Sequence, residues 1–309
     1  MKKLFLLALP ACLLFACKKE TNPNDISTYT LNMYRKNHTV AAQQFQVDAA
    51  NGNSFITTKG IWFKVPAGAF STLSGAPVTS GTISISVTEY FNNADMVFGK
   101  VSTTADNNTV LLTGGMFNIT AAQNNQELKL NQPVRVAIPA PGANDPDMKL
   151  FRGNEIADVA NRVVWQEIET KWTPLDTPIG NNTRFYDFTI NALNWCNLDK
   201  YADLGNGRTK MSATLPTGFS NKNAFVSLVM PNNGAVHLSP DGSVSQLFTT
   251  GNYTIPVGMQ VKILTVGTQN DKLYFTVTGP IAVTNNLNVN VPDLTTATEE
   301  QVTDAIKGL

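Results

Sequence analysis

The residues that could act in acid–base or metal chemistry are few and widely spaced. Histidine, the side chain most often used as a general base near neutral pH, occurs only at His38 and His237. His38 lies beside a polar N-terminal segment and His237 in the apolar stretch AVHLS. The sequence contains no HExxH, CxxC, GxSxG, P-loop or GxGxxG motif. We therefore expect a protein that is not an enzyme and has no catalytic residues, metal site or cofactor.

Two pairs of carboxylates have spacings that can serve chemistry. Glu167 and Glu169 are two positions apart in VVWQEIETKW, which on a strand places both on one face about 7 Å apart. That separation suits a pair of glycosidase carboxylates, but a solvated strand face accounts for it as well. Asp145 and Asp147 are candidate calcium ligands, although NDPDMK lacks the acidic density and glycine of a calcium loop.

Tryptophan side chains are the candidates for binding a small ligand, because exposed indoles stack on sugar rings. Trp62 lies in GIWFKV, where Ile61 and Phe63 take the opposite face of an extended strand. Trp165 and Trp172 flank the two glutamates. These three tryptophans form a candidate glycan-stacking set; the alternative is that they fill a sandwich core or the joint between modules.

The three cysteines have different surroundings. Met1-Lys2-Lys3 followed by the apolar run Leu4 to Ala16 has the pattern of a secretory signal peptide, and its length is too short to cross a bilayer. Cys12 lies inside this run and Cys17 at its end, where LLFACKKE turns to charge. Cys196 is then left alone in NWCNLDK, so we expect a buried thiol and no internal disulfide.

The residues Leu14-Phe15-Ala16-Cys17 resemble the lipobox of bacterial lipoproteins. The resemblance implies cleavage before Cys17 and acylation of its sulfur, which would anchor the chain in a membrane. Leu9-Pro10-Ala11-Cys12 is a weaker competing match. In that family, a residue other than aspartate after the cysteine, here Lys18, implies the outer membrane. Lys19-Glu20 resembles part of a surface-export signal, so the protein is a candidate for display on the cell surface.

Charge excludes nucleic acid as a partner. The chain has 23 basic and 23 acidic residues, and loss of Lys2 and Lys3 with the signal leaves 21 against 23, a net charge of −2. No block of lysine or arginine supplies the footprint that phosphate neutralisation requires.

The fold class follows from period-two alternation. In TISISVTEY, Ile83, Ile85 and Val87 alternate with polar residues, and similar stretches recur from residue 39 onward. Turn sequences such as Asn51-Gly52 and Asn270-Asp271 separate them. FVSLVM and VKILTV are apolar on both faces and suit an interior strand. The prediction is an all-β chain of tandem antiparallel β-sandwich modules. A capping box at Thr298–Gln301 predicts a short C-terminal α-helix docked on the last sandwich.

Composition suggests the following division of the chain. We expect a signal peptide over residues 1–16, a flexible polar tether over 17–38 and a first sandwich over 39–142. The Pro- and Gly-rich PAPGANDPDMK ends that module. A short β segment over 143–204 should pack on a neighbouring module, and a second sandwich with the helix should occupy 205–309.

The stretches KGIWFKVPAGAF, GTISISVTEYF, TGGMFNITA and VRVAIPAP resemble the ZU5-type β-sandwich over about Lys59 to Pro141. The order of segments along the chain is also similar to that of uncharacterised Gram-negative envelope lipoproteins. In those proteins this module precedes a W…NxD segment, which here is NWCNLD. ZU5 modules mostly mediate protein–protein contact and bring no catalytic residues. The resemblance implies an outer-membrane lipoprotein that acts as a protein-interaction or scaffolding module of the envelope. The alternative is an accessory glycan-binding lipoprotein.

Overall fold

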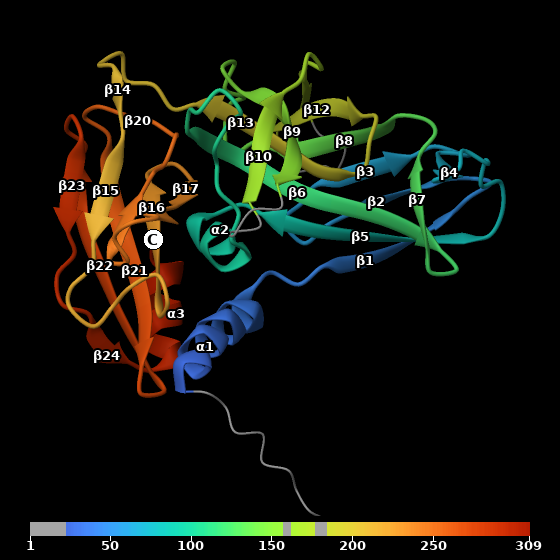
Figure 1. Cartoon of the computed structure of the whole chain (residues 1–309). Helices are drawn as coiled ribbons and strands as arrows, with labels where there is room; N and C mark the ends of the chain where they lie inside the picture. Colours follow the sequence, from blue (N-terminus) through green and yellow to red (C-terminus); the bar gives the residue numbers. More distant parts are fainter. Residues whose placement is uncertain (1–22, 157–161, 177–183) are drawn as a thin grey trace, which may run out of the picture.

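The alternation of apolar and polar residues places one face of each predicted strand in a core. In β5 (Thr82–Tyr90), Ile83, Ile85 and Val87 are buried, whereas Thr82 and Ser84 are exposed. The computed structural model describes residues 23–156, 162–176 and 184–309. In these residues strands predominate, and they form two β-sandwiches side by side (Figure 1). The predicted all-β class with tandem sandwiches is confirmed.

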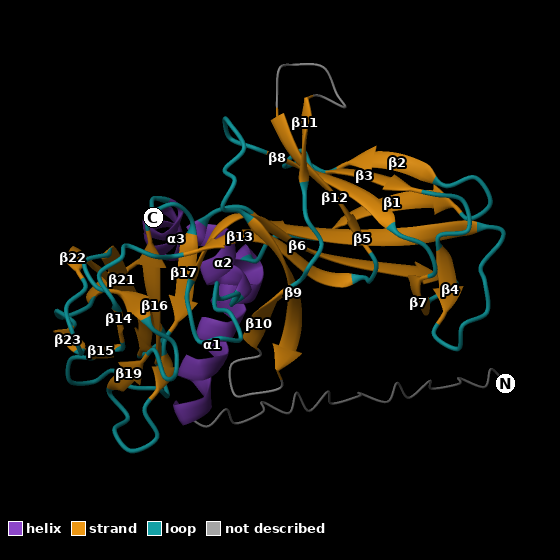
Figure 2. Cartoon of the chain, turned by 90° about the horizontal axis from the view of Figure 1, so that it is seen from above, coloured by secondary structure: helices purple, strands orange, loops and turns teal. Residues whose placement is uncertain are grey.

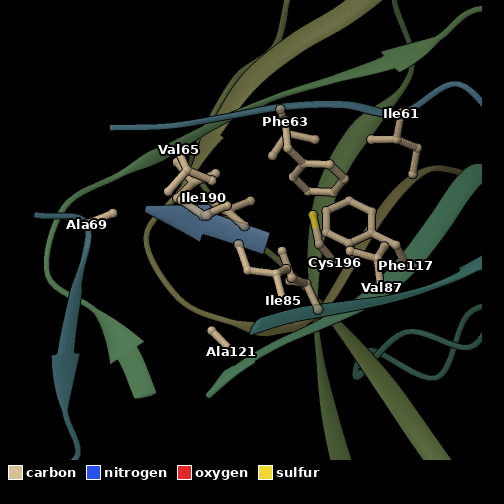
Figure 3. Close-up of a cluster of buried hydrophobic side chains, with 14 of the residues drawn as sticks. Ile61, Phe63, Val65, Ala69, Ile85, Val87, Phe117, Ala121, Ile190 and Cys196 are labelled. Atoms are coloured by element: carbon tan, nitrogen blue, oxygen red, sulfur yellow. The ribbon is translucent and has the colours of Figure 1, made fainter. Parts of the chain in front are cut away.

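The first sandwich packs two antiparallel sheets around an apolar core that contains Phe63, Phe117 and Cys196 (Figure 3). One sheet has the order β1-β5-β6-β13-β9-β10, with β7 and β4 added beside β6. Its remaining strands are β1 (Gln43–Asp48), β6 (Leu111–Gln123), β13 (Asn194–Tyr201), β9 (Lys149–Ile156), β10 (Arg162–Glu167), β7 (Gln126–Leu130) and β4 (Phe70–Thr72). The facing sheet has the order β11 (Thr173–Asp176), β12 (Arg184–Ile190), β8 (Val134–Pro139), β3 (Trp62–Val65) and β2 (Asn53–Ile56).

The segment 143–204 is part of the first sandwich. It supplies strands to both sheets, because β13 lies between β6 and β9, and β12 pairs with β8. Cys196 and Leu198 of β13 are core residues of this sandwich. The first sandwich therefore runs from β1 to β13, well beyond residue 142, and PAPGANDPDMK connects two of its strands.

The second sandwich is formed by the C-terminal third of the chain. One sheet has the order β17 (Gly234–His237), β16 (Ala224–Met230), β21 (Gln260–Gln269), β22 (Lys272–Ala282) and β24 (Thr295–Ala297). The other has the order β18 (Ser239–Pro240), β19 (Leu247–Thr249), β15 (Met211–Thr214) and β23 (Leu287–Asn290). Two short strands, β14 (Arg208–Thr209) and β20 (Ile255–Pro256), pair separately. The β15–β23 pair is parallel, a departure from the otherwise antiparallel arrangement of the paired strands described.

Both faces of β16 and β21 are buried, as their doubly apolar sequences predict. One face belongs to the core of the second sandwich, with Leu228 and Ile263. The other face, with Val229 and Leu264, is covered by helices at the junction of the two sandwiches (Figure 2). These helices are α1 (Pro23–His38), α2 (Asn93–Gly99) and α3 (Glu299–Lys307).

The predicted C-terminal helix is confirmed, together with its capping box. The Thr298 hydroxyl accepts from the Gln301 backbone N–H, and the Gln301 side chain accepts from the Thr298 N–H. Val302 and Ile306 are buried against the outer face of the second sandwich. The helix therefore covers a sheet face and not a sheet edge.

The prediction of a flexible tether over residues 17–38 is wrong for the part that the structure describes. Leu31, Tyr34, Arg35 and His38 follow the i, i+3, i+4, i+7 spacing of a helical stripe, and all four pack at the junction. The Tyr34 hydroxyl lies 3.0 Å from the Thr303 hydroxyl of α3. Because the rest of the segment is polar, its composition alone does not reveal this narrow helical stripe. Residues 1–22, with Cys12 and Cys17, lie outside the described residues.

Burial of the α1 stripe predicts a large effect of Tyr34→Ala on stability. Tyr34 is 3% exposed and Met33 on the same helix is 41% exposed. Removal of a buried aromatic ring should lower the free energy of unfolding by about 3 kcal/mol or more. Met33→Ala, the matched control, should change it by less than about 0.5 kcal/mol. Urea unfolding measures both, and equal small effects would restore the tether interpretation.

Candidate functional site

His237 and Ser227 form the arrangement that most resembles a nucleophile–base pair. The Ser227 Oγ and His237 Nδ1 atoms are 2.8 Å apart, and His237 Nε2 lies 3.2 Å from the Met96 carbonyl oxygen. A carbonyl only accepts, so Nε2 carries the proton and Nδ1 accepts. Burial and the nearby Arg35 charge lower the pKa of His237 to about 3. Ser227 is fully buried, so the candidate nucleophile has no access to a substrate and the pair serves the structure.

His38 also has a structural role, at the contact between α1 and α3. Its Nε2 atom lies 2.9 Å from Glu299 Oε1, and its ring packs against Phe98 and Tyr34. The contacts of both histidines are those of structural residues. Both histidines also lie at the junction of the two sandwiches.

The predicted pairing of Glu167 and Glu169 on one strand face is wrong, because β10 ends at Glu167. Glu167 accepts hydrogen bonds from Lys149 Nζ at 2.8 Å and from the Tyr201 hydroxyl at 2.9 Å. Partial burial raises the pKa of Glu167, but these two donors outweigh it and the net shift is downward. A carboxylate held ionised in this way is a poor general acid.

Asp145 and Asp147 do not converge on a cation position. Asp145 Oδ2 pairs with Lys200 Nζ at 2.8 Å, and its Oδ1 accepts from the Asp147 backbone N–H. The lysine hydrogen bond lowers the pKa of Asp145. In the described ranges, no group of three or more histidine, cysteine or acidic residues could hold a metal ion.

The candidate glycan-stacking tryptophans are not gathered on one surface. Trp165 is 0% exposed and donates its indole N–H to the Ser102 carbonyl, so its assignment to a stacking set is wrong. The connection between α2 and β6 covers it. Trp62 is half-buried beneath Arg135, whose guanidinium lies 5.6 Å from the ring centroid and pairs with Asp187. Trp172 is half-buried as well.

Trp172 lines a groove of about 560 Å³ on the first sandwich. Its indole N–H donates to the Met148 carbonyl at 2.7 Å, and its ring packs edge-on against Tyr186. Both predicted glutamates line the same groove, with basic side chains beside them: Lys149, Glu167, Glu169, Lys171. An aromatic ring with flanking charges can hold a polar ligand such as a glycan, although the groove provides no acid–base pair.

A second groove of about 650 Å³ is also lined by the Pro139–Lys149 segment. It is bounded by Tyr186 and the Asp145–Lys200 ion pair of the first sandwich, and by the Asn232-Asn233 turn of the second. Met148 borders both grooves. The segment that the composition marked as a module boundary therefore forms a wall of two concave surfaces.

Asp199 is a buried carboxyl that the sequence interpretation did not single out. It lies in β13 and is 0% exposed, and its Oδ2 atom accepts a hydrogen bond from Asn197 Nδ2. The side-chain carbonyl of Asn197 accepts in turn from the Thr113 hydroxyl. Burial raises the pKa of Asp199 to about 8, so the carboxyl is mostly protonated near neutral pH. The sequence signal was available: Asn197 and Asp199 alternate with the core residues Cys196 and Leu198. A buried acid without solvent access does not supply protons to a substrate.

Cys196 has the buried position expected of it. Its thiol is unpaired and lies in the core of the first sandwich, where burial raises its pKa to about 12. A thiol in this state is inert as a nucleophile.

No protein-family model matches the chain, and no curated protein matches it. In the part of the chain that is described, no helix has the length and apolar character needed to span a membrane.

Asp199 predicts a specific dependence of stability on pH. Between the ordinary value of 3.8 and about 8, the folded state keeps a proton that the unfolded state has lost. The free energy of unfolding should therefore fall as pH rises through this window, by up to about 1.4 kcal/mol per unit. In Asp199→Asn this contribution disappears, so the variant should gain stability relative to wild type as pH rises. Denaturant unfolding across the window tests this, with exposed Asp147→Asn as control; parallel pH profiles for all three proteins would contradict it.

Proposed function

We propose that this chain is a non-catalytic lipoprotein, anchored in the outer membrane through Cys17, that serves as a protein-interaction or scaffolding module of the cell envelope. The sequence LLFACKKE and its resemblance to a lipobox support the anchor. Lys18 after the cysteine supports the outer membrane, and Lys19-Glu20 supports exposure at the cell surface.

The observation that carries the proposal is the position of α1. This helix begins at Pro23, so residues 18–22 are all that separates it from Cys17. Five residues span at most about 18 Å even when fully extended. Because α1 packs on α2, which belongs to the first sandwich, and on β21 of the second, a lipid on Cys17 would restrain both sandwiches at the membrane.

The chemistry of the described side chains supports binding in preference to catalysis. The groups with acid–base potential are each engaged in structural bonds: His237 by Ser227 and Met96, Glu167 by Lys149 and Tyr201. Asp199 is inaccessible to a substrate.

The residues that carry the resemblance to ZU5 modules have structural roles, which fits a shared sandwich. Glu89, the acidic residue of GTISISVTEYF, is buried and accepts from the Thr57 hydroxyl, the Gln43 amide at 2.6 Å and the Lys59 N–H at 3.2 Å. These bonds fasten the loop that leads into β3. The interaction role that the resemblance implies would then depend on the surface. Large exposed apolar side chains such as Ile56, Leu73 and Val244 lie on separate elements, so the grooves beside Pro139–Lys149 are the better candidates for a partner.

Cys17→Ala should abolish both lipid labelling and capture of a partner. In cells fed a palmitate analogue, wild type and Cys12→Ala should be labelled, because Cys12 would be removed with the signal. Cys17→Ala should lose the label and the membrane fraction. Crosslinking in intact cells should then recover a defined envelope protein with wild type and Cys12→Ala but not with Cys17→Ala. Membrane-bound, labelled Cys17→Ala would refute the anchor, and absence of any captured protein with wild type would refute the scaffold.

Glycan binding is a second candidate function, favoured by Trp172 and the charged side chains in its groove. If it operates, a glycan array should give a ligand for the wild-type protein. Trp172→Ala should weaken that binding at least about tenfold, as loss of an aromatic anchor does at binding sites. Trp62→Ala is the matched control, because Trp62 is also half-buried but does not line this groove. Equal loss in both variants, or no ligand on the array, would exclude this function.

A further inference from the structure

A small cavity of about 160 Å³ lies at the junction where α1, the end of α2 and β17 meet. Figure 2 shows α1 and α2 between the two sandwiches, with β17 at the adjoining edge of the second. Its polar wall contains Arg35, Lys100 and His237, and its apolar wall contains Phe225 and Phe248. The volume equals about five water molecules in the liquid, so any occupant must be small.

Arg35 brings a buried positive charge to this cavity without a matching negative one. It is 8% exposed, and its guanidinium lies 4.0 Å from the centroid of the Phe225 ring. Its Nη2 donates to the Val97 carbonyl at 2.9 Å and lies 3.3 Å from His237 Nδ1. Arg35 Nε has no hydrogen-bond partner among the described residues, and none of their ion pairs includes Arg35. Burial lowers its pKa to about 9, which reflects the cost of this uncompensated charge.

The neighbouring side chains do not compensate Arg35. His237 is neutral, because burial and the charge of Arg35 lower its pKa to about 3. Its ring nitrogens are bonded to Ser227 and to the Met96 carbonyl. Lys100 adds a second positive charge, and its Nζ is bonded to the Asn32 side-chain oxygen at 3.1 Å. Burial and the charge of Arg35 together lower the pKa of Lys100. Two carboxylates on the adjoining helices pair with other groups: Asp95 of α2 pairs with Lys59, and Glu299 of α3 pairs with His38.

We propose that this cavity binds a small molecule bearing an oxyanion, a carboxylate or phosphate group, between Arg35 and Lys100, with a short apolar part against Phe225 and Phe248. An arginine guanidinium and a lysine ammonium both form charge-assisted hydrogen bonds to such groups. The aromatic wall favours a ligand with a few carbon atoms over a bare ion. The oxyanion would supply the negative charge that the described residues lack, and it would link α1 and α2 to the second sandwich.

The test measures binding of defined anions to the full chain by calorimetry and by thermal shift, at constant ionic strength. The probes are acetate, butyrate, inorganic phosphate and phenyl phosphate, with chloride as the reference salt. We expect saturable binding of at least one oxyanion, with butyrate tighter than acetate or phenyl phosphate tighter than inorganic phosphate. The head group that binds distinguishes a carboxylate ligand from a phosphate ligand.

Substitutions of the two basic residues test whether the anion binds in this cavity. Arg35→Gln and Lys100→Gln should each weaken it at least about tenfold, the effect of losing one charge-assisted hydrogen bond. Lys64→Gln makes the same change in net charge at an exposed position on β3 and should bind as wild type does. Arg35 also bonds to α2, so Arg35→Gln could fail to fold; Lys100→Gln, at the more accessible position, then decides. Equal thermal shifts in all variants, or no saturable binding of any probe, would overturn the proposal.

Discussion

The C-terminal end of α2 is the point on which the arrangement of the two sandwiches depends. The last carbonyls of a helix lack intrahelical donors, and a buried helix end must obtain them from elsewhere. Here the Val97 carbonyl receives the guanidinium of Arg35 from α1. The Met96 carbonyl accepts from the Lys100 and Val101 backbone N–H groups and also from the imidazole of His237 in the second sandwich. The positive charge of Arg35 also interacts favourably with the partial negative charge at the C-terminal end of the helix. One short helix inserted between β5 and β6 thus ties the N-terminal helix and the second sandwich to the first.

This junction explains why the second sandwich has apolar residues on both faces of its central strands. The face with Val229, Leu264 and Val266 would be exposed if the sandwich stood alone. It is instead covered by helices from the beginning, the middle and the end of the described chain, so the two modules share buried surface. If Cys17 carries a lipid as proposed, the anchor would act through α1 on both modules.

The positions of the buried polar side chains follow from the same need of buried groups for hydrogen-bond partners. The Arg35, His237 and Asp199 side chains bond to backbone carbonyls or to a neighbouring amide. Burial and the nearby charge of Arg35 keep His237 neutral, and removal from water keeps Asp199 mostly protonated near neutral pH. The accessible charged groups, such as Lys149 and Glu167, are paired across the Trp172 groove. The molecule thus has surfaces suited to binding, and its buried ionisable groups serve the fold.

The sequence by itself determined those features whose causes are local. Alternation in TISISVTEY predicted a half-buried strand, the Thr298–Gln301 capping box predicted the start of α3, and the lack of a partner cysteine for Cys196 indicated a buried thiol without a disulfide. Residue types also brought Trp172 and the two glutamates forward as ligand-binding candidates. Tertiary structure alone decided that residues 143–204 complete the first sandwich, that residues 31–38 form a buried helical stripe, and that Trp165 is covered. It also placed Arg35, Lys100 and His237 around one cavity. The reason is physical: strand partners and covered faces depend on contacts between residues far apart in the chain, and a periodic pattern shows which face is apolar but not what will cover it.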